Sequence, residues 1–403
     1  MKLPDDNDTR CGSGELTVDR LTSCDQIESI RSEWNDLHDE LAPGSIHSDV
    51  DWYCTIARSF TDNRAPVVFT VRRNKELAGL VAGYYHERRT PLKLGYFQIG
   101  HFKAPALSTH YQSCLARNEA DLHRTIAETL WNELSNGNAR LIYVNALPTE
   151  DPLYRLLVKT PFSKGIHLAY PPARHMMMHL GKSLEETIAS KGSSVRAFLR
   201  RIINRNSRPD AAPIFTVRLF TRSEEIPTYF IDAETVAEKT YQRALNVGFF
   251  PTSLHREQVE LSAKKVFFRG SILYDGEKPV AFQEDYLCGT HCFNPYVGYD
   301  PAYGSKNPGT LLMIKAWDEL IKSTKAAIYD FGYGEGLYKE RFADFCICEG
   351  ELLLFSRTLG NVFFYTVLSV DLLINKSVKH LLNSMGIYNV IKKFWRRLKT
   401  GNS

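Results

Sequence analysis

The sequence has no strong marker of export, of a membrane span or of a nucleic-acid partner. Its first ten residues, MKLPDDNDTR, are acidic where a secretory signal needs an apolar core, so a cytoplasmic location is expected. No run of about 18 uninterrupted apolar residues occurs. The nearest, NVFFYTVLSVDLLI at 361–374, is short and contains Asp371, so it should not span a bilayer alone. A net charge of +4 over 403 residues does not by itself indicate a DNA or membrane partner.

Cysteine is sparse, and the signatures of several enzyme classes are missing. No Gly-x-Ser-x-Gly elbow or Walker loop occurs, which argues against a serine hydrolase or an NTPase. The histidines and cysteines that lie close together are Cys288, His291 and Cys292, and then His175 and His179. Neither group supplies four ligands at zinc-binding spacing, so no metal is expected. The thiols expected to be buried and free are those of Cys288, Cys292, Cys346 and Cys348.

What is present is an ordinary globular composition, with 43% hydrophobic and 24% charged residues. A chain of this length favours two domains. In the first half the expected elements are a helix at 25–41, a hairpin at 65–88, a helix at 119–135 and a strand at 140–146. In the second half they are helices at 183–205, 223–243 and 254–269, a hairpin at 271–287, a strand to about 299, a helix at 308–322 and a strand at 326–331.

The two halves repeat a similar order of elements, which predicts two similar α/β units with mixed sheets. The joint is expected near 170–182, where two adjacent prolines favour an extended linker. The predicted division is 16–172 for the first domain, 173–360 for the second and 361–403 for a helical basic tail.

The stretch YDPAYGSKNPGTLL contains a candidate anion site. Asn307 is suited to cap a helix, Pro308 to its first turn, and Gly309 lets a ligand approach the backbone. The amides of Gly309, Thr310 and Leu311 would then face a phosphate, helped by the helix dipole. The alternative interpretation is a capped surface helix without a ligand.

The stretch YDFGYGEGLYKERF predicts a tight loop beside a strand end. Asp330 ends a buried strand, and three glycines follow within five residues. Ligands collect at the carboxyl ends of strands in open α/β sheets, so Tyr338 and Lys339 are candidates to face a site. The alternative is a plain glycine-rich turn with Tyr338 packed and Lys339 solvated.

These two stretches, with the PVAF hairpin before them, resemble the GNAT-fold proteins of the CelD-like group, which are related to the Fem-type peptidoglycan aminoacyltransferases. The resemblance extends upstream through KTYQRALNVGFF at 239–250 and SKGSSVRAFLRRIINR at 190–205. It implies a tandem of two GNAT-like domains, in which the second holds the donor and the first is structural or shapes the substrate.

The resemblance implies an N- or O-acyltransferase that uses a thioester donor, with acyl-CoA first and a carrier protein or aminoacyl-tRNA as alternatives. The acceptor would be an amine or a hydroxyl, on a small molecule or a saccharide, in cell-envelope or polysaccharide metabolism. Of the glycines in the usual donor-binding loop only Gly309 is present. A different class remains open, a non-catalytic adaptor that binds a carrier protein or a polysaccharide synthase.

Direct acyl transfer needs a base for the nucleophile and an acid for the leaving thiolate, but no metal. Glu284 and Asp330 are the candidate bases; the alternatives are a glutamate on the hairpin surface and an aspartate that caps loop amides. Tyr338 is the candidate acid, and Lys339 would hold a substrate anion.

Substrate contacts are expected from two helices. Tyr241 and Gln242 match the substrate-facing region of the family by position. The helix at 186–205 has a basic face, and its cations are Lys191, Arg196, Arg200, Arg201 and Arg205. Arg196 and Arg200 are candidates to grip donor phosphates, a carrier protein or tRNA, and the equal alternative is a solvated face.

The tail has no acidic residue after Asp371. Its seven cations are Lys376, Lys379, Lys392, Lys393, Arg396, Arg397 and Lys399. Such a segment is suited to peripheral contact with anionic membranes. For 361–374 we favour packing of the apolar side against the second domain.

Overall fold

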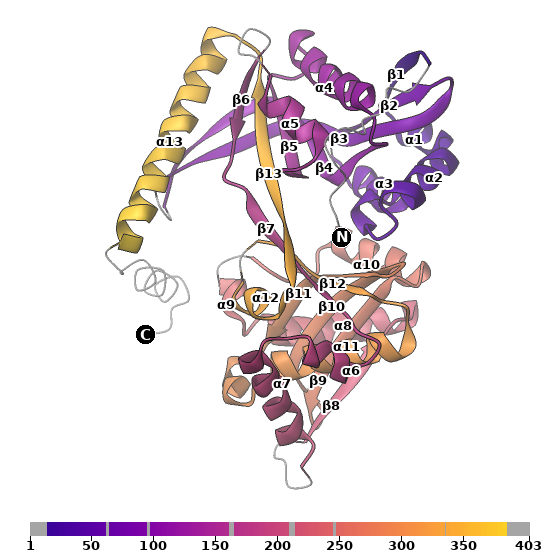
Figure 1. Cartoon of the computed structure of the whole chain (residues 1–403), viewed down its shortest axis with the longest axis vertical. Coiled ribbons are helices and arrows are strands. Elements are labelled where there is room, and N and C mark those ends of the chain that lie inside the picture. The colour runs from indigo at the N-terminus through magenta and orange to yellow at the C-terminus, as the bar shows by residue number, and fades with distance from the viewer. Residues whose placement is uncertain are drawn as a thin grey trace. The chain divides into compact units, whose positions relative to one another are not determined.

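The computed structural model describes residues 14–61, 64–94, 97–160, 165–208, 214–244, 247–334 and 336–384. The chain forms two compact units, each a mixed α/β structure (Figure 1). Among the described residues, unit 1 contains those up to 173 and 348–384, and unit 2 contains those of 174–347.

Unit 1 is built on a sheet in the order β1-β2-β3-β4-β5-β13, with β6 also paired to β13. Its strands are β1 (Leu16–Leu21), β2 (Arg64–Arg73), β3 (Glu76–Leu94), β4 (Phe97–Ala116), β5 (Leu141–Pro148), β6 (Ile166–Ala169) and β13 (Phe345–Phe355). Its helices are α1 (Cys24–Ser29), α2 (Arg31–Leu41), η1 (Ile46–Ser48), α3 (Val50–Arg58), α4 (Ala120–Ser135), α5 (Pro152–Val158) and α13 (Leu359–Ser384).

Alternation along the strands of unit 1 places apolar side chains on both faces of the sheet. Val67 and Phe69 pack in a cluster with α4 and α5. Val68, between them, packs in a separate cluster with residues of α1, α2 and α3. Both faces of this sheet are therefore covered by helices.

Unit 2 is built on a sheet in the order β7-β12-β11-β10-β9-β8. Its strands are β7 (Ala173–His179), β8 (Phe215–Phe220), β9 (Phe268–Asp275), β10 (Lys278–Cys288), β11 (His291–Tyr299) and β12 (Ile328–Tyr333). Its helices are α6 (Leu184–Ala189), α7 (Ser193–Asn206), η2 (Ser223–Glu225), α8 (Ile226–Ala237), α9 (Tyr241–Ala244), α10 (Ser253–Lys264), η3 (Pro301–Lys306), α11 (Pro308–Ser323) and α12 (Leu337–Phe342).

The core of unit 2 lies between its sheet and helices α6, α7 and α11. Trp317 of α11 is fully buried and packs in one cluster with Tyr329 and Phe331 of β12. Ring contacts of Tyr229, from α8, with Phe268 and Phe249 form a second aromatic cluster beside β9 and β10.

The prediction of two similar α/β halves is confirmed by a shared succession of elements. In unit 1, β2, β3 and β4 form antiparallel hairpins, and α4 then leads to β5, which is parallel to β4. In unit 2, β9, β10 and β11 form antiparallel hairpins, and α11 leads to β12, which is parallel to β11. The mixed-sheet fold class expected from the sequence is therefore correct.

Several predicted helices are interrupted or shorter than expected. The helix expected at 25–41 divides at Ile30, the one at 183–205 divides into α6 and α7 before Gly192, and the one at 223–243 divides after Ala237. The helix expected at 254–269 ends at Lys264, because Phe268 already begins β9. Helical spacing of apolar residues does not by itself reveal these interruptions.

The segment predicted as an extended linker contains strand β7. Met176, Met177 and Met178 of this strand are all buried, and β7 pairs antiparallel with β12. The joint between the units is thus an ordered strand.

The structure also differs from the predicted division near the carboxyl end. Residues 348–360 were assigned to the second domain, but they group with unit 1, because β13 pairs with β5 and β6. The prediction that 361–374 packs on the second domain is wrong for the same region: Leu368 of α13 is buried in a cluster with Leu141 and Leu353 of unit 1. In the part of the chain that the structure describes, no helix is long and apolar enough to cross a membrane.

The prediction that four cysteines have buried thiols is correct for two of them. Cys288 and Cys292 are buried thiols, as expected. Cys346 is only partly buried and Cys348 is exposed, which contradicts the prediction for that pair. Both lie in the first half of β13, where the burial pattern leaves the strand partly open.

Candidate functional site

Strands β11 and β12 of unit 2 begin as parallel partners, and their pairing then stops. They pair at three positions, His291 with Ile328 through Phe293 with Asp330, although both strands continue further. Just beyond this point, two residues of β11, Asn294 and Pro295, lie opposite one residue of β10. This is a β-bulge, which re-aims backbone groups locally. Beyond Phe293, β11 is thus paired with β10 but no longer with β12.

A cavity of about 420 Å³ lies at the carboxyl end of β11. It is bounded by the end of that strand, the first turn of α11 and helix α12. The lining residues that matter below are Gln242, Gly298, Tyr299, Gly309, Thr310 and Tyr338. The structure therefore brings three of the predicted stretches, around 242, 309 and 338, to one cavity. Tyr241 begins α9, and its side chain lies outside the described residues.

The start of α11 differs in detail from the predicted cap. Asn307 has a left-handed backbone (φ 55°) and makes no side-chain cap, so its predicted capping role is wrong. Its carbonyl oxygen instead accepts the amide of Leu311 at 3.0 Å, so the Leu311 amide is used inside the helix. Gly309 and Thr310 belong to the first turn, whose amides have no partner within the helix. These two residues line the cavity.

A side chain at Gly309 would crowd the cavity wall. A Cβ at this position would lie 3.2 Å from Cδ1 of Tyr299, which is tighter than ordinary van der Waals contact. Gly309 thus keeps the first turn of α11 open on the side of the cavity.

The arginines of α7 have partners within unit 2. Arg205 donates to the carbonyl oxygens of the two residues before Asn307, which holds the turn that leads into α11. Arg196 donates to two carbonyl oxygens at the end of α6, at 3.2 and 2.8 Å. Arg200 pairs with Glu185. Arg196 and Arg200 do not line the cavity, so a phosphate grip by these two residues stays a prediction.

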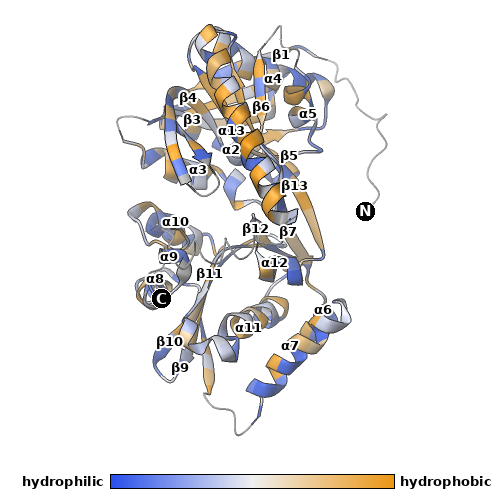
Figure 2. Cartoon of the chain, turned by 90° about the vertical axis from the view of Figure 1, so that its left-hand side faces the viewer, coloured by the Kyte–Doolittle hydropathy of each residue, from blue (hydrophilic) through white to orange (hydrophobic). Residues whose placement is uncertain are grey.

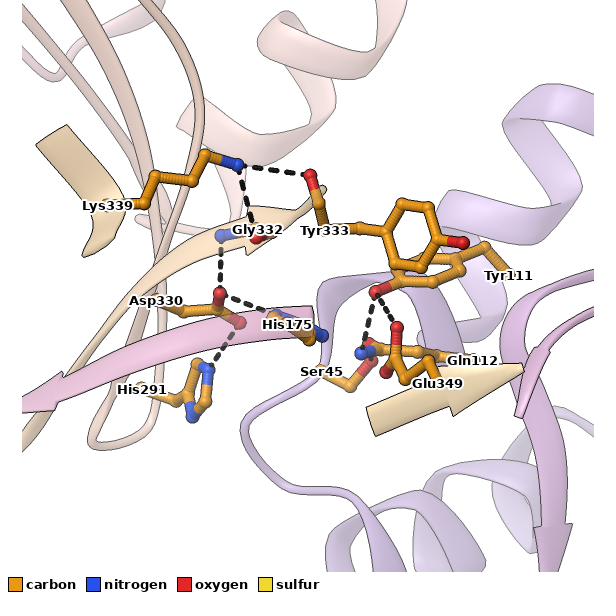
Figure 3. Close-up of polar contacts among 10 residues, drawn as sticks. All are labelled: Ser45, Tyr111, Gln112, His175, His291, Asp330, Gly332, Tyr333, Lys339 and Glu349. Carbon is orange, nitrogen blue, oxygen red and sulfur yellow. Dashed lines mark hydrogen bonds and ion pairs between the residues drawn. The ribbon is translucent and has the colours of Figure 1, made fainter. Parts of the chain in front are cut away.

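Asp330 is buried between two histidines (Figure 3). Its Oδ1 lies 2.6 Å from Nε2 of His175 and accepts the amide of Gly332 at 2.6 Å, and its Oδ2 lies 3.0 Å from Nε2 of His291. Burial acts to raise the pKa of Asp330, but the hydrogen bonds and charges of the two histidines outweigh it and hold this pKa well below the ordinary range. Such a carboxylate is a poor proton acceptor, which contradicts the prediction that Asp330 is the base.

The two histidines were considered in the sequence only as metal ligands. A signal for their true partner was available, because a charged aspartate inside an apolar strand needs cationic or hydrogen-bonding neighbours. The sequence did not show which ones, since His175 lies 155 residues from Asp330. No group of three or more metal-binding side chains occurs among the residues that the structure describes.

Lys339 lies on α12 and binds the glycine loop, the glycine-rich segment that begins at Gly332. Its Nζ donates to the carbonyl oxygens of Gly332 at 3.1 Å and Tyr333 at 3.0 Å (Figure 3). Burial lowers the pKa of Lys339 to about 8, although Asp330 acts in the opposite direction. Its neighbour Tyr338 lines the cavity, so the loop that Lys339 closes also positions Tyr338.

Glu284 is fully buried. This contradicts its interpretation as a surface residue and argues against its role as the base. Its carboxylate receives the hydroxyl of Tyr286 at 2.8 Å, that of Tyr229 at 3.3 Å and Nε2 of His255 at 2.9 Å. Burial lowers the pKa of His255, but the Glu284 carboxylate outweighs burial and raises it. The Glu284 side chain is 0% exposed and its carboxylate already accepts from three donors, so it cannot accept a proton from a bound substrate.

Asp285, the next residue, was not singled out from the sequence. It is buried opposite the bulge and accepts from Gln283 at 2.6 Å, Asn294 at 2.8 Å and Tyr329 at 2.9 Å. Burial raises its pKa to about 7, against these hydrogen bonds. Asn294 also donates to the carbonyl oxygen of Glu284 at 2.8 Å, so this network fixes the bulge.

The corresponding place in unit 1 is built differently. There the pairing of β4 with β5 also covers three positions, but four residues, His110–Ser113, lie opposite Ala82 of β3. Side chains of unit 1 bind this wide bulge: Ser45 donates to Gln112 at 2.7 Å, and Tyr111 donates to Glu349 at 3.2 Å (Figure 3).

The crossover helix of unit 1 begins with acids. Glu119 and Asp121, at the start of α4, both pair with Arg73, at 2.7 and 2.8 Å. An anion would be repelled at this helix start, in contrast to the start of α11, where no acid is present in the first turn.

Comparison with known proteins places this geometry in a known fold. Residues 193–340 match the family of the acetyltransferase (GNAT) domain, a stretch that includes α11, β11, β12 and the cavity. Two solved structures are similar to this chain over about four fifths of its length. A conserved protein of unknown function from Bacteroides thetaiotaomicron has a TM-score of 0.52 at 11% identity, and covers 81% of this chain and 97% of its own. FemX has a TM-score of 0.55 at 10% identity, and covers 83% of this chain and 96% of its own.

These likenesses show the fold. A search of the curated proteins found no match. Residues 193–340 of unit 2 thus match a GNAT domain in a chain with two α/β units of similar order, and the GNAT fold expected from the sequence is confirmed. Membership of the CelD-like group stays a prediction.

Proposed function

We propose that the protein is an N- or O-acyltransferase whose unit 2 holds a thioester donor, acyl-CoA, in the cavity at the start of α11. The observation that carries this proposal is the opening between β11 and β12, with a cavity bounded by the first-turn residues Gly309 and Thr310. First-turn amides and the helix dipole attract a phosphate group, and the largely apolar cavity beside them suits the thioester arm.

The donor carbonyl would lie where β11 and β12 part, beside the bulge at Asn294 and Pro295. Main-chain amides there would stabilise the oxyanion formed when the acceptor nitrogen or oxygen attacks the carbonyl carbon. The C–S bond then breaks, and the hydroxyl of Tyr338 supplies a proton to the departing thiolate.

The proton of the acceptor would go to His291. This imidazole is 25% exposed, and the buried carboxylate of Asp330 lies behind it. A carboxylate in this position orients the ring toward the acceptor. Asp330 would therefore act through His291, while Lys339 would hold the loop and the contact of Asn294 with Asp285 would hold the bulge in place.

The donor is assigned to unit 2 alone. In unit 1 the acids Glu119 and Asp121 occupy the start of the helix that corresponds to α11. We propose that residues 16–172 are structural or shape the acceptor site, and that the acceptor is an amine or hydroxyl on a small molecule or saccharide, as in polysaccharide metabolism. A cytoplasmic location is part of this proposal, because CoA is an intracellular donor.

The test measures donor binding and turnover on the full chain. Calorimetry with CoA and acetyl-CoA should give one site per chain, and thiol release should depend on an added amine or sugar acceptor. Binding without thiol release for any acceptor would favour the adaptor function. Salt-sensitive binding of tRNA, with no binding of CoA, would favour aminoacyl transfer from tRNA.

A further inference from the structure

Helix α13 of unit 1 has two apolar faces, and only one of them is packed. On the packed face, Leu368 is 3% exposed and lies in a cluster with strands of the unit 1 sheet. Polar contacts fix the same side: Asp371 accepts the amide of Lys93 at 2.9 Å, and Asn375 donates to the carbonyl oxygen of Lys93 at 2.6 Å.

The opposite face of α13 carries a stripe of exposed apolar side chains. Phe363 is 64% exposed and Leu373 is 62% exposed. The α13 stripe consists of Leu359, Phe363, Val370, Leu373, Ile374, Val378 and Leu381. At 3.6 residues per turn these positions fall on one side of the helix, away from Leu368. Figure 2 shows the apolar colouring along α13.

Charge indicates what covers the α13 stripe. Asp371 is the last acidic residue of the chain, and it is held by Lys93. The chain then carries seven lysines and arginines, the first of which are Lys376 and Lys379 on α13 itself. The other five lie outside the described residues but follow directly from the end of the helix. An apolar stripe next to a segment of one positive sign matches an anionic lipid surface.

A second copy of the chain fits this surface less well. Two α13 stripes in contact would bring together two segments that each carry seven cations and no acid after Asp371. The like charges would oppose such a pair, whereas lipid phosphates would neutralise them.

We propose that the α13 stripe binds the surface of an anionic lipid bilayer, with the helix along the membrane plane and its other face still packed on unit 1. This attaches the enzyme to the membrane without any change in the donor cavity of unit 2. The inference is independent of the proposed acyl transfer, because it rests on α13 and on the charges that follow it in the sequence.

The test is flotation of the full chain with vesicles of phosphatidylcholine alone or mixed with phosphatidylglycerol. The protein should float with the anionic vesicles only, and high salt should release it. The double variant Phe363→Glu, Leu373→Glu should lower vesicle binding at least about tenfold, since it places charge in the apolar interface. The matched control is Ile231→Glu on α8 of unit 2, where the side chain is 67% exposed. It should bind vesicles like the wild type.

Several outcomes would overturn the proposal. These are no flotation of the full chain, equal binding to neutral vesicles, or an equal loss of binding in the Ile231→Glu control. Light scattering that shows a dimer abolished by the stripe variants would assign the surface to a second copy instead. Circular dichroism of each variant keeps a loss of binding distinct from a loss of fold, and CoA binding measured in parallel separates this result from the proposed function.

Discussion

The side chains of Asp330 and Lys339 form hydrogen bonds with the two peptide groups on either side of Gly332. Asp330 accepts the Gly332 amide at 2.6 Å, and Nζ of Lys339 donates to the Gly332 carbonyl oxygen at 3.1 Å. Gly332 has φ +74°, a backbone that L side chains rarely adopt. A strand-end carboxylate and a helix ammonium thus fix the turn that brings Tyr338 to the cavity.

The first prediction concerns the donor site. Gly309→Val should weaken CoA binding at least about tenfold, because its Cβ meets Tyr299 and its methyl groups enter the cavity beside the first-turn amides. Calorimetry measures the effect. Gly192→Val is the matched control, since a Cβ there meets nothing within 4 Å. Equal affinities in both variants would show that the donor binds elsewhere.

The second prediction concerns the chemistry. Tyr338→Phe and His291→Gln should each lower thiol release about a hundredfold to ten-thousandfold, the usual cost of removing a positioned acid or base. CoA affinity should change far less, because neither hydroxyl nor imidazole is assigned to the phosphate. Asp330→Asn should lower turnover through His291, because the imidazole loses the carboxylate that orients it. Normal turnover in all three folded variants would refute the catalytic assignment and favour the adaptor.

The third prediction concerns acid stability. The folded-state pKa of Asp330 is lowered, so its contribution to the free energy of unfolding is present above the unfolded pKa near 4 and is lost as the pH falls below it. The wild type should lose stability between about pH 5 and pH 3 more steeply than Asp330→Asn, measured by urea unfolding. Asp318→Asn, which removes the surface pair with Lys322, serves as the control and should follow the wild type. Identical slopes for the wild type and Asp330→Asn would contradict the prediction.

The fourth prediction concerns Asp285, whose pKa shift has the opposite sign. Its folded-state pKa is raised to about 7 by burial, so its contribution is present at low pH and is lost as the pH rises toward and through 7. Protonation is favoured by the surroundings: among the described residues, Oε1 of Gln283 and Oδ1 of Asn294 are buried acceptors without a hydrogen-bond partner, and a protonated carboxyl adds a donor. Arg269, whose charge lowers this pKa, opposes the shift.

Asp285→Asn should remove that pH dependence. Relative to the wild type, the variant should gain stability between about pH 5 and pH 8 as the wild-type carboxyl ionises. Urea unfolding at these two pH values measures the difference. A constant difference between variant and wild type across this range would show that Asp285 is ionised throughout.

The fifth prediction concerns α13. Leu368→Ala should lower the free energy of unfolding by about 2 to 4 kcal/mol, because the leucine is buried against unit 1. Leu373→Ala, at an exposed position of the same helix, should cost less than about 0.5 kcal/mol. Denaturant unfolding monitors both. Similar small effects would mean that α13 does not pack on unit 1 in solution.

Local sequence signals predicted most of the secondary structure around the site. The Asp275-Gly276 turn marks the hairpin of β9 and β10, and Pro308 marks the first turn of α11. Both act within a few residues, through φ preferences and the missing amide of proline. The same signals placed a glycine-rich loop beside the end of the strand at 326–331, and with it Tyr338 and Lys339.

Local signals could not predict which distant groups meet. His175 and Asp330 are 155 residues apart and become neighbours only because β7 pairs with β12. The sequence indicated a surface Glu284, but a tyrosine from α8 and a histidine from α10 seal it. The assignments of Glu284 and Asp330 as the base failed for the same reason. The sequence does not show which groups from other elements bind a carboxylate near a strand end, and these groups decide whether it can accept a proton from a substrate.

By itself, then, the sequence determined the repeated α/β order and the stretches around 309 and 338, because periodicity, turns and helix starts depend on neighbouring residues. The GNAT-type fold and the stretch around 242 were indicated by resemblance to a known family. Tertiary structure alone decided the direction of the pKa shifts of Asp330, Asp285 and Lys339, the placement of β13 and α13 on unit 1, and the apolar stripe left uncovered. Burial and strand pairing cause all of these, and both are set by contacts between segments far apart in the chain.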